Sequence, residues 1–256
     1  MGAGSTCVFC FEPGGLVRTG CACRGECAVL HVRCLVRAIR ASGVQEAWIR
    51  CRLCNQEFTG PLSCALAKTR AGLAASCECE EFCAEVHAID ALCESQHTRR
   101  AEARARALLE RTVARLGQGS EQARIVTLRL AIALMQRRAH AEAERLVLLV
   151  LGASSASSAS SASSASSQAL TAQAMTMLAR IMHATSRLAE AERIWRSLPP
   201  QEPSAAIITR VLMCETLSAR RTLAAPELAA ALSDARRVFG ESHAVTRKAA
   251  AICIAR

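Results

Sequence analysis

Cysteine and histidine side chains form four short pairs near the start of the chain, and their spacing constrains the fold more than any other feature. Eight of the fifteen cysteines lie within the first 54 residues. The pairs are Cys7 and Cys10, Cys21 and Cys23, His31 and Cys34, and Cys51 and Cys54. Two thiolates on one tight turn can point at the same ion, and a closed set of four protein ligands is typical of structural zinc. The spacing therefore predicts two structural zinc ions (Zn2+), held by these eight side chains.

The sequence shows no sign of export or of a membrane span, which favours metal ligands over disulfides. No basic patch followed by a long apolar stretch opens the chain, and the longest apolar run, residues 146–151, is too short to cross a bilayer. We therefore expect a cytoplasmic protein with reduced thiols, and a nuclear location stays open. The first 62 residues can bury little apolar area, so metal binding would supply their folding free energy, on the order of 10 kcal/mol per site.

Beyond the cysteine pairs, the composition favours helices. Ala and Leu are frequent, aromatic residues make up 3% and Tyr is absent. We expect one helix over Val32–Ala41 and another over Leu62–Ala75, then a helical pattern almost throughout from Thr98. Residues 63–98 would form a helical linker that carries the acidic, cysteine-bearing stretch Cys77–Cys83.

A repeat runs through the helical part. The motif Ala-Glu-Ala-Glu-Arg occupies Ala141–Arg145 and again Ala189–Arg193, and each copy follows an apolar-faced helical stretch. The two copies are 48 residues apart, but a Ser/Ala low-complexity segment, residues 153–167, lies between them and would loop out. Without that segment the offset approaches the 34 residues of tetratricopeptide helix pairs.

Residues 99–256 resemble, in degenerate form, the tetratricopeptide repeats of kinesin light chains. The resembling residues are Gly117–Thr127 and Gly240–Thr246, which look like the loops that join one helix pair to the next. Stacked helix pairs leave an inner groove that usually holds a peptide or a partner protein. The resemblance therefore implies an all-α helical-repeat domain whose groove binds a protein substrate of unknown identity. An unspecific all-helical bundle is the alternative.

The order of the zinc ligands, four cysteines, one histidine and three cysteines, is shared by plant homeodomain fingers and RING-CH (RING-variant) fingers. Here one residue separates Cys21 from Cys23, and seven residues separate Cys23 from His31. This spacing resembles the RING-CH finger. Further matching residues are Gly25, Leu35 and Phe58. The resemblance covers about residues 5–62.

The RING-CH resemblance implies an interleaved fold, the cross-brace, in which alternating pairs share an ion. The first ion would be held by Cys7, Cys10, His31 and Cys34, and the second by Cys21, Cys23, Cys51 and Cys54. We therefore expect residues 1–62 to form a small zinc-stabilised RING-like cross-brace domain (α+β), followed by the all-α repeats. Cys27 offers a second usable spacing to Cys23, but the pair Cys21 and Cys23 matches the family, so Cys27 should not be a ligand.

The same resemblance implies a ubiquitin-protein ligase, a transferase that acts by positioning and has no catalytic nucleophile. Such a finger docks a ubiquitin-conjugating enzyme carrying ubiquitin, and the helical repeats would select the substrate. The docking residues carried over from the family are Phe9, Leu35, Ala38, Leu53 and Asn55. Ala38 stands where many members have Trp, and Asn55 where Arg or Lys is common. These departures keep an alternative open, a zinc-dependent protein-interaction scaffold without ligase activity.

Composition disfavours two other functions, chromatin reading and nucleic-acid binding. A chromatin reader of the plant homeodomain type needs an aromatic cage for methyl-lysine, and Tyr is absent. The net charge of +10 could attract nucleic acid, but Arg residues are interleaved with Glu and aromatic residues for base stacking are scarce.

A third metal site could be built from Cys77, Cys79, Cys83 and His87. We expect free thiols on a helix there instead, and two zinc ions per chain.

Overall fold

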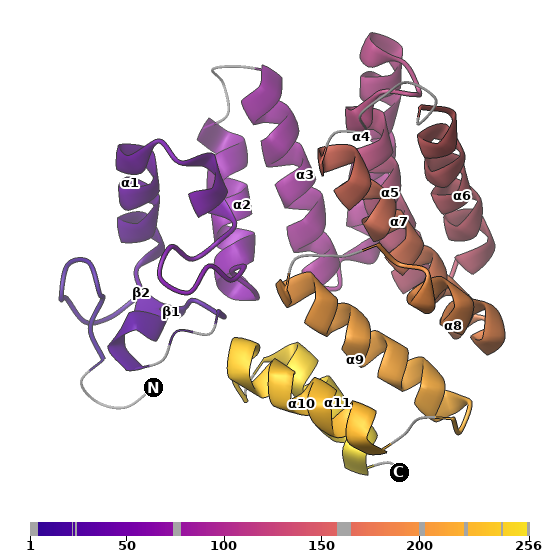
Figure 1. The fold of residues 1–256 in the computed structure, drawn as a ribbon. Coiled ribbons are helices and arrows are strands. Elements are labelled where there is room, and N and C mark those ends of the chain that lie inside the picture. Colours follow the sequence, from indigo (N-terminus) through magenta and orange to yellow (C-terminus); the bar gives the residue numbers. More distant parts are fainter. Residues whose placement is uncertain are drawn as a thin grey trace. The chain divides into compact units, whose positions relative to one another are not determined.

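The computed structural model describes residues 5–21, 23, 25–73, 78–157, 165–199, 203–222, 225–241 and 243–254. The chain divides into two compact units, Met1–His97 and Thr98–Arg256 (Figure 1). The described residues contain eleven α-helices and one two-stranded sheet, so a small cysteine-rich unit precedes an all-helical one. None of the described helices combines the length and the apolar character that crossing a membrane requires.

The first unit contains a short antiparallel sheet in which Val17 lies opposite Leu30 and Arg18 lies opposite Val29. Its elements are β1 (Val17–Arg18), the 3-10 helix η1 (Gly25–Ala28), β2 (Val29–Leu30), α1 (Val32–Ser42), the 3-10 helix η2 (Gln45–Trp48), α2 (Pro61–Leu73) and α3 (Glu78–Glu94). Helix α2 packs against α1 and α3. Helices α1 and α2 confirm the two helices predicted in this part, except that residues 74 and 75 lie outside the described residues.

The core of the first unit is small and includes two of the predicted zinc ligands. Helix α1 buries Leu35 and Ile39, because these residues are four apart and so lie on one face of the helix. The buried cluster consists of Cys7, Leu30, Leu35, Ile39, Ala47, Trp48, Cys51, Phe58, Leu62 and Leu66. Since thiols take up part of this core, its packing depends on what those thiols bind.

The second unit is a succession of helices that each pack against the next one along the chain. They are α4 (Thr98–Leu116), α5 (Glu121–Gln136), α6 (His140–Ser157), α7 (Ala165–Ala184), α8 (Leu188–Arg196), α9 (Pro203–Ala219), α10 (Ala225–Phe239) and α11 (Ala244–Ile254). Helix α5 also contacts α7, α7 contacts α9, and α9 contacts α11. These four alternate helices therefore form one layer of the unit (Figure 1).

The Ser/Ala segment differs from the loop that its composition predicts. Helix α6 continues to Ser157 and α7 begins at Ala165, so both ends of residues 153–167 are helical. Alanine is the strongest helix former, and lengthening an existing helix needs no new nucleus, so the segment extends its neighbours at both ends. Residues 158–164 lie outside the described residues.

One turn geometry recurs after α5, α7 and α9, and it makes the repeat visible in the backbone. In each turn one residue has a left-handed conformation, with φ near 60°: Arg138, Ser186 and Arg221. The next residue then donates its N–H to the carbonyl five positions earlier: Ala139 to Leu134, Arg187 to Met182, and Thr222 to Leu217, at 2.8–2.9 Å. This is a Schellman motif built without glycine. Three helices of the second unit therefore end in the same way. Helix α3 of the first unit ends so too, with Gln96 at φ 61° and the His97 N–H donating to Leu92 O at 2.9 Å.

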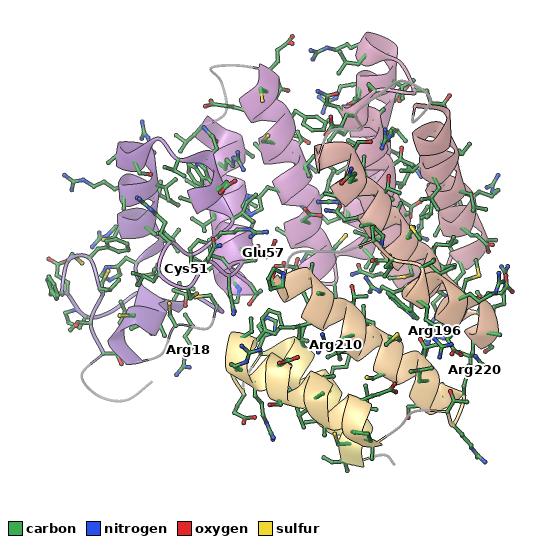
Figure 2. The ribbon with its side chains drawn as sticks, in the orientation of Figure 1. Arg18, Cys51, Glu57, Arg196, Arg210 and Arg220 are labelled. Carbon is green, nitrogen blue, oxygen red and sulfur yellow. The ribbon has the colours of Figure 1, made fainter. Side chains whose placement is uncertain are left out.

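A recurring ion pair accompanies the repeated turn. The fifth residue of α4, α6 and α8 is a glutamate that pairs with an arginine just beyond the end of the following odd-numbered helix. The pairs are Glu102 with Arg137, Glu144 with Arg187, and Glu192 with Arg220. Glu192 also pairs with Arg196 at 2.6 Å, and Arg196 and Arg220 lie close together (Figure 2). Each glutamate thus links one helix pair to the next.

The buried position of Glu192 generates a stability prediction. Its side chain is 10% exposed and lies between two arginines, so Glu192→Gln should lower the free energy of unfolding by about 2 kcal/mol. The control is Glu190→Gln in the same motif, where the side chain is 40% exposed and solvent screens its ion pair, so the expected loss is much smaller. Urea unfolding followed by helical circular dichroism measures both, and equal losses would contradict the proposed link.

Candidate metal centre

The eight predicted ligands gather into two clusters of four. Cys7, Cys10, His31 and Cys34 form the first cluster, and Cys21, Cys23, Cys51 and Cys54 form the second. Within each cluster the ligand atoms all lie within 4.8 Å of one another. Each cluster takes its members from alternate pairs along the chain, so the segments that carry them are interleaved.

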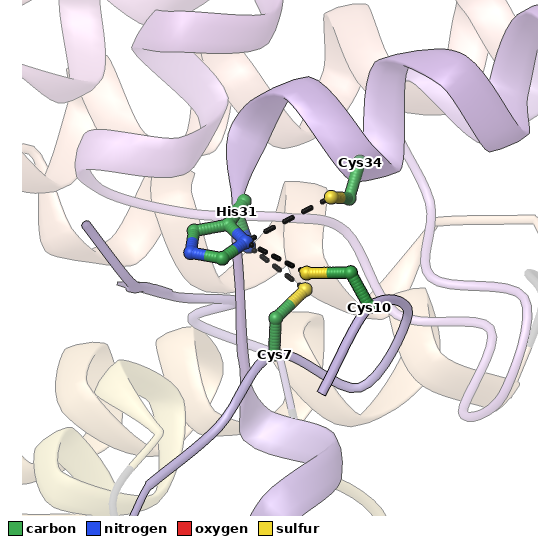
Figure 3. A group of neighbouring side chains, drawn as sticks. All are labelled: Cys7, Cys10, His31 and Cys34. Atoms are coloured by element: carbon green, nitrogen blue, oxygen red, sulfur yellow. Dashed lines mark hydrogen bonds between the residues drawn. The ribbon is translucent and has the colours of Figure 1, made fainter. Parts of the chain in front are cut away.

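His31 presents one defined nitrogen to the first cluster. Its Nδ1 lies 3.2 Å from Cys10 Sγ and 3.8 Å from Cys34 Sγ (Figure 3). Its Nε2 lies 2.5 Å from the carbonyl oxygen of Gly14. A carbonyl can only accept a hydrogen bond, so Nε2 carries the proton and the Nδ1 lone pair faces the sulfurs. A partner for the second ring nitrogen is the usual arrangement of a metal-binding histidine.

The pairs at Cys7 and Cys51 are held by loops of the same geometry. Cys7 donates its N–H to Glu12 O at 3.0 Å, and Phe11 donates to Cys7 O at 2.8 Å. In the second cluster Cys51 donates to Gln56 O and Asn55 donates to Cys51 O, both at 2.8 Å. The residue after each pair is left-handed, with φ of 60° at Phe11 and 55° at Asn55. We call these two loops the knuckles, residues 7–12 and 51–56.

The two knuckles differ in how well their sequences suit this backbone. Asparagine adopts the left-handed region more readily than other non-glycine residues, whereas a bulky side chain there is an outlier. Phe11 therefore costs the first knuckle on the order of 1 kcal/mol. Its side chain is also 76% exposed, so it gains no burial in the first unit in return.

Backbone donors stabilise the thiolate form in the first cluster. Burial alone would raise the pKa of the Cys7 thiol, but hydrogen bonds from the backbone N–H groups of His31, Phe9 and Cys10 outweigh it and lower the pKa to about 6. His31 N lies 3.3 Å from Cys7 Sγ. Because the thiolate is the form that ligates a metal, these donors prepare the site for a cation.

In the second cluster four thiols lie close together. Cys23 Sγ lies 3.6 Å from Cys51 Sγ, and Thr19 Oγ1 lies 3.2 Å from Cys21 Sγ. Burial and the neighbouring thiols raise the pKa of Cys23 well above its ordinary value. Thr19 is itself buried, so its hydroxyl is positioned to donate to a Cys21 thiolate once a cation balances the charge.

Gly20 precedes Cys21 of the second cluster and lies where two chain segments approach each other closely. Its φ is 68°, and a Cβ at this position would lie 2.4 Å from Thr59 Oγ1 and 2.6 Å from Thr59 O. The Thr59 hydroxyl donates to Gly20 O at 2.9 Å. Only glycine satisfies both the left-handed backbone and the contact, so this residue fixes where Cys21 lies relative to Thr59, in the segment after the second knuckle.

The donor sets suit zinc. Three sulfurs with one imidazole nitrogen, and four sulfurs, are the soft, four-ligand sets typical of structural zinc. The two clusters could each hold one zinc ion, as the sequence predicts, and the described cysteines are free of disulfides. With four protein ligands a site has no open position, so the chemistry of a metal-bound water is not available to it.

The remaining candidate ligands stay outside the two clusters. Cys27 is exposed and belongs to neither. Within the described part of the chain no further group of metal-binding side chains assembles around Cys79, Cys83 and His87, and Cys77 lies outside it. Burial and the charge of Arg70 lower the pKa of His87 to about 4, which indicates a neutral core histidine.

The predicted docking residues lie in different surroundings. Phe9 and Leu53 are 45% and 71% exposed, on the two knuckles, and Asn55 is exposed beside Leu53. Ala38 is half-buried on α1, and Leu35 belongs to the buried core. Phe11, which we did not predict, is the most exposed aromatic residue of the described chain. An apolar residue next to a cysteine pair was the only sequence signal that could have indicated it.

The cluster membership predicts how zinc content responds to cysteine substitution. Cys23→Ser removes one of four ligands and should lower bound zinc from two ions per chain to one or fewer, whereas Cys27→Ser should retain both. Elemental analysis of the tag-free chain by inductively coupled plasma mass spectrometry measures this. Loss of zinc in Cys27→Ser with retention in Cys23→Ser would reassign the ligand.

The contact at Gly20 predicts a stability difference between two glycines with the same backbone. Gly20→Ala adds a clash with Thr59 to the strain of a positive φ and should destabilise the first unit by at least ~3 kcal/mol. Gly43→Ala, at φ 65° with nothing within 4 Å of the added Cβ, should cost only ~1 kcal/mol. Chelator titration at several temperatures should release zinc more readily from the first variant, and equal release would refute the close approach.

Comparison of the chain with protein-family models, with curated proteins and with solved structures gave no match. What the first unit can do therefore rests on the geometry of its two clusters and on the residues that surround them.

Proposed function

We propose that the chain is a RING-CH-type ubiquitin ligase, in which the first unit docks a ubiquitin-conjugating enzyme and the second unit binds the substrate. The observation that carries this proposal is the interleaving of two closed four-ligand clusters taken from alternate pairs. The spacing of the second pair and of His31 supports a RING-CH finger in particular. The domains would then be a RING-CH finger over residues 1–62, a helical linker over 63–98 and tetratricopeptide-like repeats over 99–256.

The knuckles supply the surface that a conjugating enzyme would contact. Phe9 and Phe11 extend from the first knuckle and Leu53 from the second, and all three are substantially exposed. Exposed apolar side chains on a rigid loop lose little conformational entropy on binding, and aromatic residues are frequent anchors at interfaces. Leu35 is buried in the core, Ala38 is half-buried on α1, and Asn55 is exposed on the second knuckle. Phe11 would therefore be a docking residue beside the five that the resemblance implies.

The proposed reaction needs no nucleophile from this chain. The conjugating enzyme brings ubiquitin as a thioester on its own cysteine, and the amine of a substrate lysine attacks that thioester carbonyl. The thiol of the conjugating enzyme leaves, and an amide bond replaces the thioester. A docked finger raises the rate by holding the thioester in the orientation that the amine can attack. The two zinc ions would keep the knuckles rigid and would take no part in bond making.

Asn55 is the strongest support for the alternative, a zinc-dependent scaffold without ligase activity. Asparagine suits the left-handed backbone of the second knuckle, so its presence there is explained by the turn alone. It offers hydrogen bonds but no charge to a bound ubiquitin. The ligase and scaffold functions share the same fold, and only an activity measurement separates them.

Thioester discharge with two variants tests the proposal. The zinc-loaded chain is mixed with several conjugating enzymes charged with ubiquitin, and release of ubiquitin to free lysine is followed by gel. Phe9→Ala should slow the discharge by about tenfold or more, in the range of an interface anchor.

Phe11→Asn is the sharper variant. It relieves the backbone strain of the first knuckle, so zinc retention should improve while discharge falls. A loss of activity with improved stability cannot be ascribed to unfolding. Absence of discharge by the wild-type chain with every conjugating enzyme would favour the scaffold, and unchanged discharge by both variants would remove the knuckles from the docking surface.

A further inference from the structure

A half-buried cysteine that the proposed function does not use, Cys83, lies on the helix pair that follows the two cysteine clusters. Helices α2 and α3 of this pair pack side by side (Figure 1). Cys83 and His87 are four residues apart on α3, so they lie on one face of that helix. Arg70, on α2, is close enough that its charge acts on His87 and that the charge of a Cys83 thiolate acts on it. A thiol, an imidazole and a guanidinium from two helices therefore lie near one another in the first unit.

Arg70 is a buried cation whose hydrogen bonds are incomplete. The residue is 5% exposed. Its Nη2 donates to Gln45 Oε1 at 3.0 Å, and Gln45 Nε2 donates in turn to Glu80 Oε1 at 2.9 Å. Its Nη1 has no hydrogen-bonding partner among the described residues. Because a guanidinium stays protonated in a protein, the N–H groups of Nη1 favour an acceptor beside them.

His87 is a second buried group of this kind. It is 4% exposed, and its Nδ1 has no hydrogen-bonding partner within the described chain. Burial, and then the charge of Arg70, lower the pKa of His87 to about 4, so the ring is neutral and adds no positive charge of its own. Buried polar atoms in folded proteins are nearly always paired. Two unpaired atoms around one thiol therefore favour a further hydrogen-bonding atom at that place.

The charge of Arg70 favours the thiolate form of Cys83. Burial lowers the pKa of the guanidinium, and the negative charges of Cys83, Glu80 and Cys79 oppose this, in decreasing order of effect. A thiolate at Cys83 is thus the anion that acts most strongly on Arg70, and the attraction is mutual. Thiolate character and access to solvent are what make a cysteine reactive toward oxidants. Cys83 combines both, since it is only half-buried.

We infer that Cys83 is a redox-sensitive thiol that hydroperoxides, such as hydrogen peroxide, convert to a sulfenate. The thiolate sulfur attacks one oxygen of hydrogen peroxide, so that an S–O bond forms and the O–O bond breaks. The leaving hydroxide takes the proton of the new S–OH group, and the products are the Cys83 sulfenate and water. The sulfur loses two electrons and the peroxide gains them. This inference goes beyond the proposed function and does not depend on it.

The surroundings favour oxidation over the other modifications of a thiol. A sulfenate keeps the negative charge beside Arg70 and adds an oxygen that can accept a hydrogen bond from Nη1. Alkylation would leave a neutral thioether, which is only a weak acceptor. A disulfide with Cys79, four residues earlier on α3, is disfavoured by geometry. Cβ atoms at that spacing on a helix lie about 5–6 Å apart, whereas a disulfide needs about 3.8 Å.

Trapping of the sulfenate in the full zinc-loaded chain tests the inference. The chain is treated with less than one equivalent of hydrogen peroxide in the presence of dimedone, and the adduct on each cysteine is quantified by peptide mass spectrometry. Cys83 should carry at least about fivefold more adduct than Cys27, Cys79 or Cys253, although these three are exposed. Exposure alone predicts the opposite order. Cys93 is buried, so its labelling reports any unfolding.

Variants of Arg70 separate the effect of its charge from that of the fold. Arg70→Gln should lower the adduct at Cys83 about tenfold, whereas Arg70→Lys, which keeps the charge, should retain most of it. Arg40→Gln removes the same charge from an exposed position on α1 and should leave Cys83 unchanged. Unfolding cannot imitate the expected loss, because it would expose Cys83 and raise its labelling.

Three results would overturn the inference: as much adduct on Cys79 as on Cys83 in the wild-type chain, undiminished labelling of Cys83 in Arg70→Gln, or an equal loss in Arg40→Gln. If Cys93 becomes labelled in Arg70→Gln, that variant has unfolded, and the order of labelling in the wild-type chain decides. No ubiquitin or conjugating enzyme is present, so the outcome is separate from that of the ligase assay.

Discussion

The bonds between thiolates and metal are the interaction on which the first unit depends. Its buried cluster is small, and Cys7 and Cys51 are part of it. A core of this size leaves a short segment marginal unless something else contributes, and two zinc ions can supply on the order of 10 kcal/mol each. Because each ion would join segments from alternate pairs, the ions would link the two ends of the finger as well as its loops. The knuckles and α1 carry ligands, and the strands of the sheet lie between ligand pairs, so those bonds would hold them together.

The knuckles connect this stability to the proposed function. Both have the same backbone, and both turn through a left-handed residue immediately after the second cysteine. Asn55 suits that position and Phe11 does not, so the first knuckle presents an exposed aromatic side chain in spite of its backbone cost. Strain that is retained at an exposed position is a feature of binding surfaces. Gly20 and Thr19 support the second cluster, and their presence is explained without any contact with a partner protein.

The second unit is held by different forces. Its helices pack mainly against their neighbours in sequence, and recurring Glu–Arg pairs join one helix pair to the next. In such an array each link is local, so stability is close to a sum over neighbouring contacts. The layer of alternate helices brings Arg180, Glu215 and Lys248 together from separate turns of the array.

The sequence by itself indicated the eight candidate ligands through their short spacings, and the RING-CH resemblance implied their division into two sets of four, which the two clusters match. It also determined the helical character of the remainder, because apolar residues at helical spacing and abundant alanine favour little else. Tertiary structure alone decided the left-handed backbone at Phe11, the contact between Gly20 and Thr59, and the burial of Leu35. It also decided that the ends of the Ser/Ala segment are helical and that Arg180 lies beside Glu215 and Lys248. The physical reason is the same throughout: local propensity and ligand spacing act over a few residues, whereas burial, close approach and charge balance depend on segments that only folding brings together.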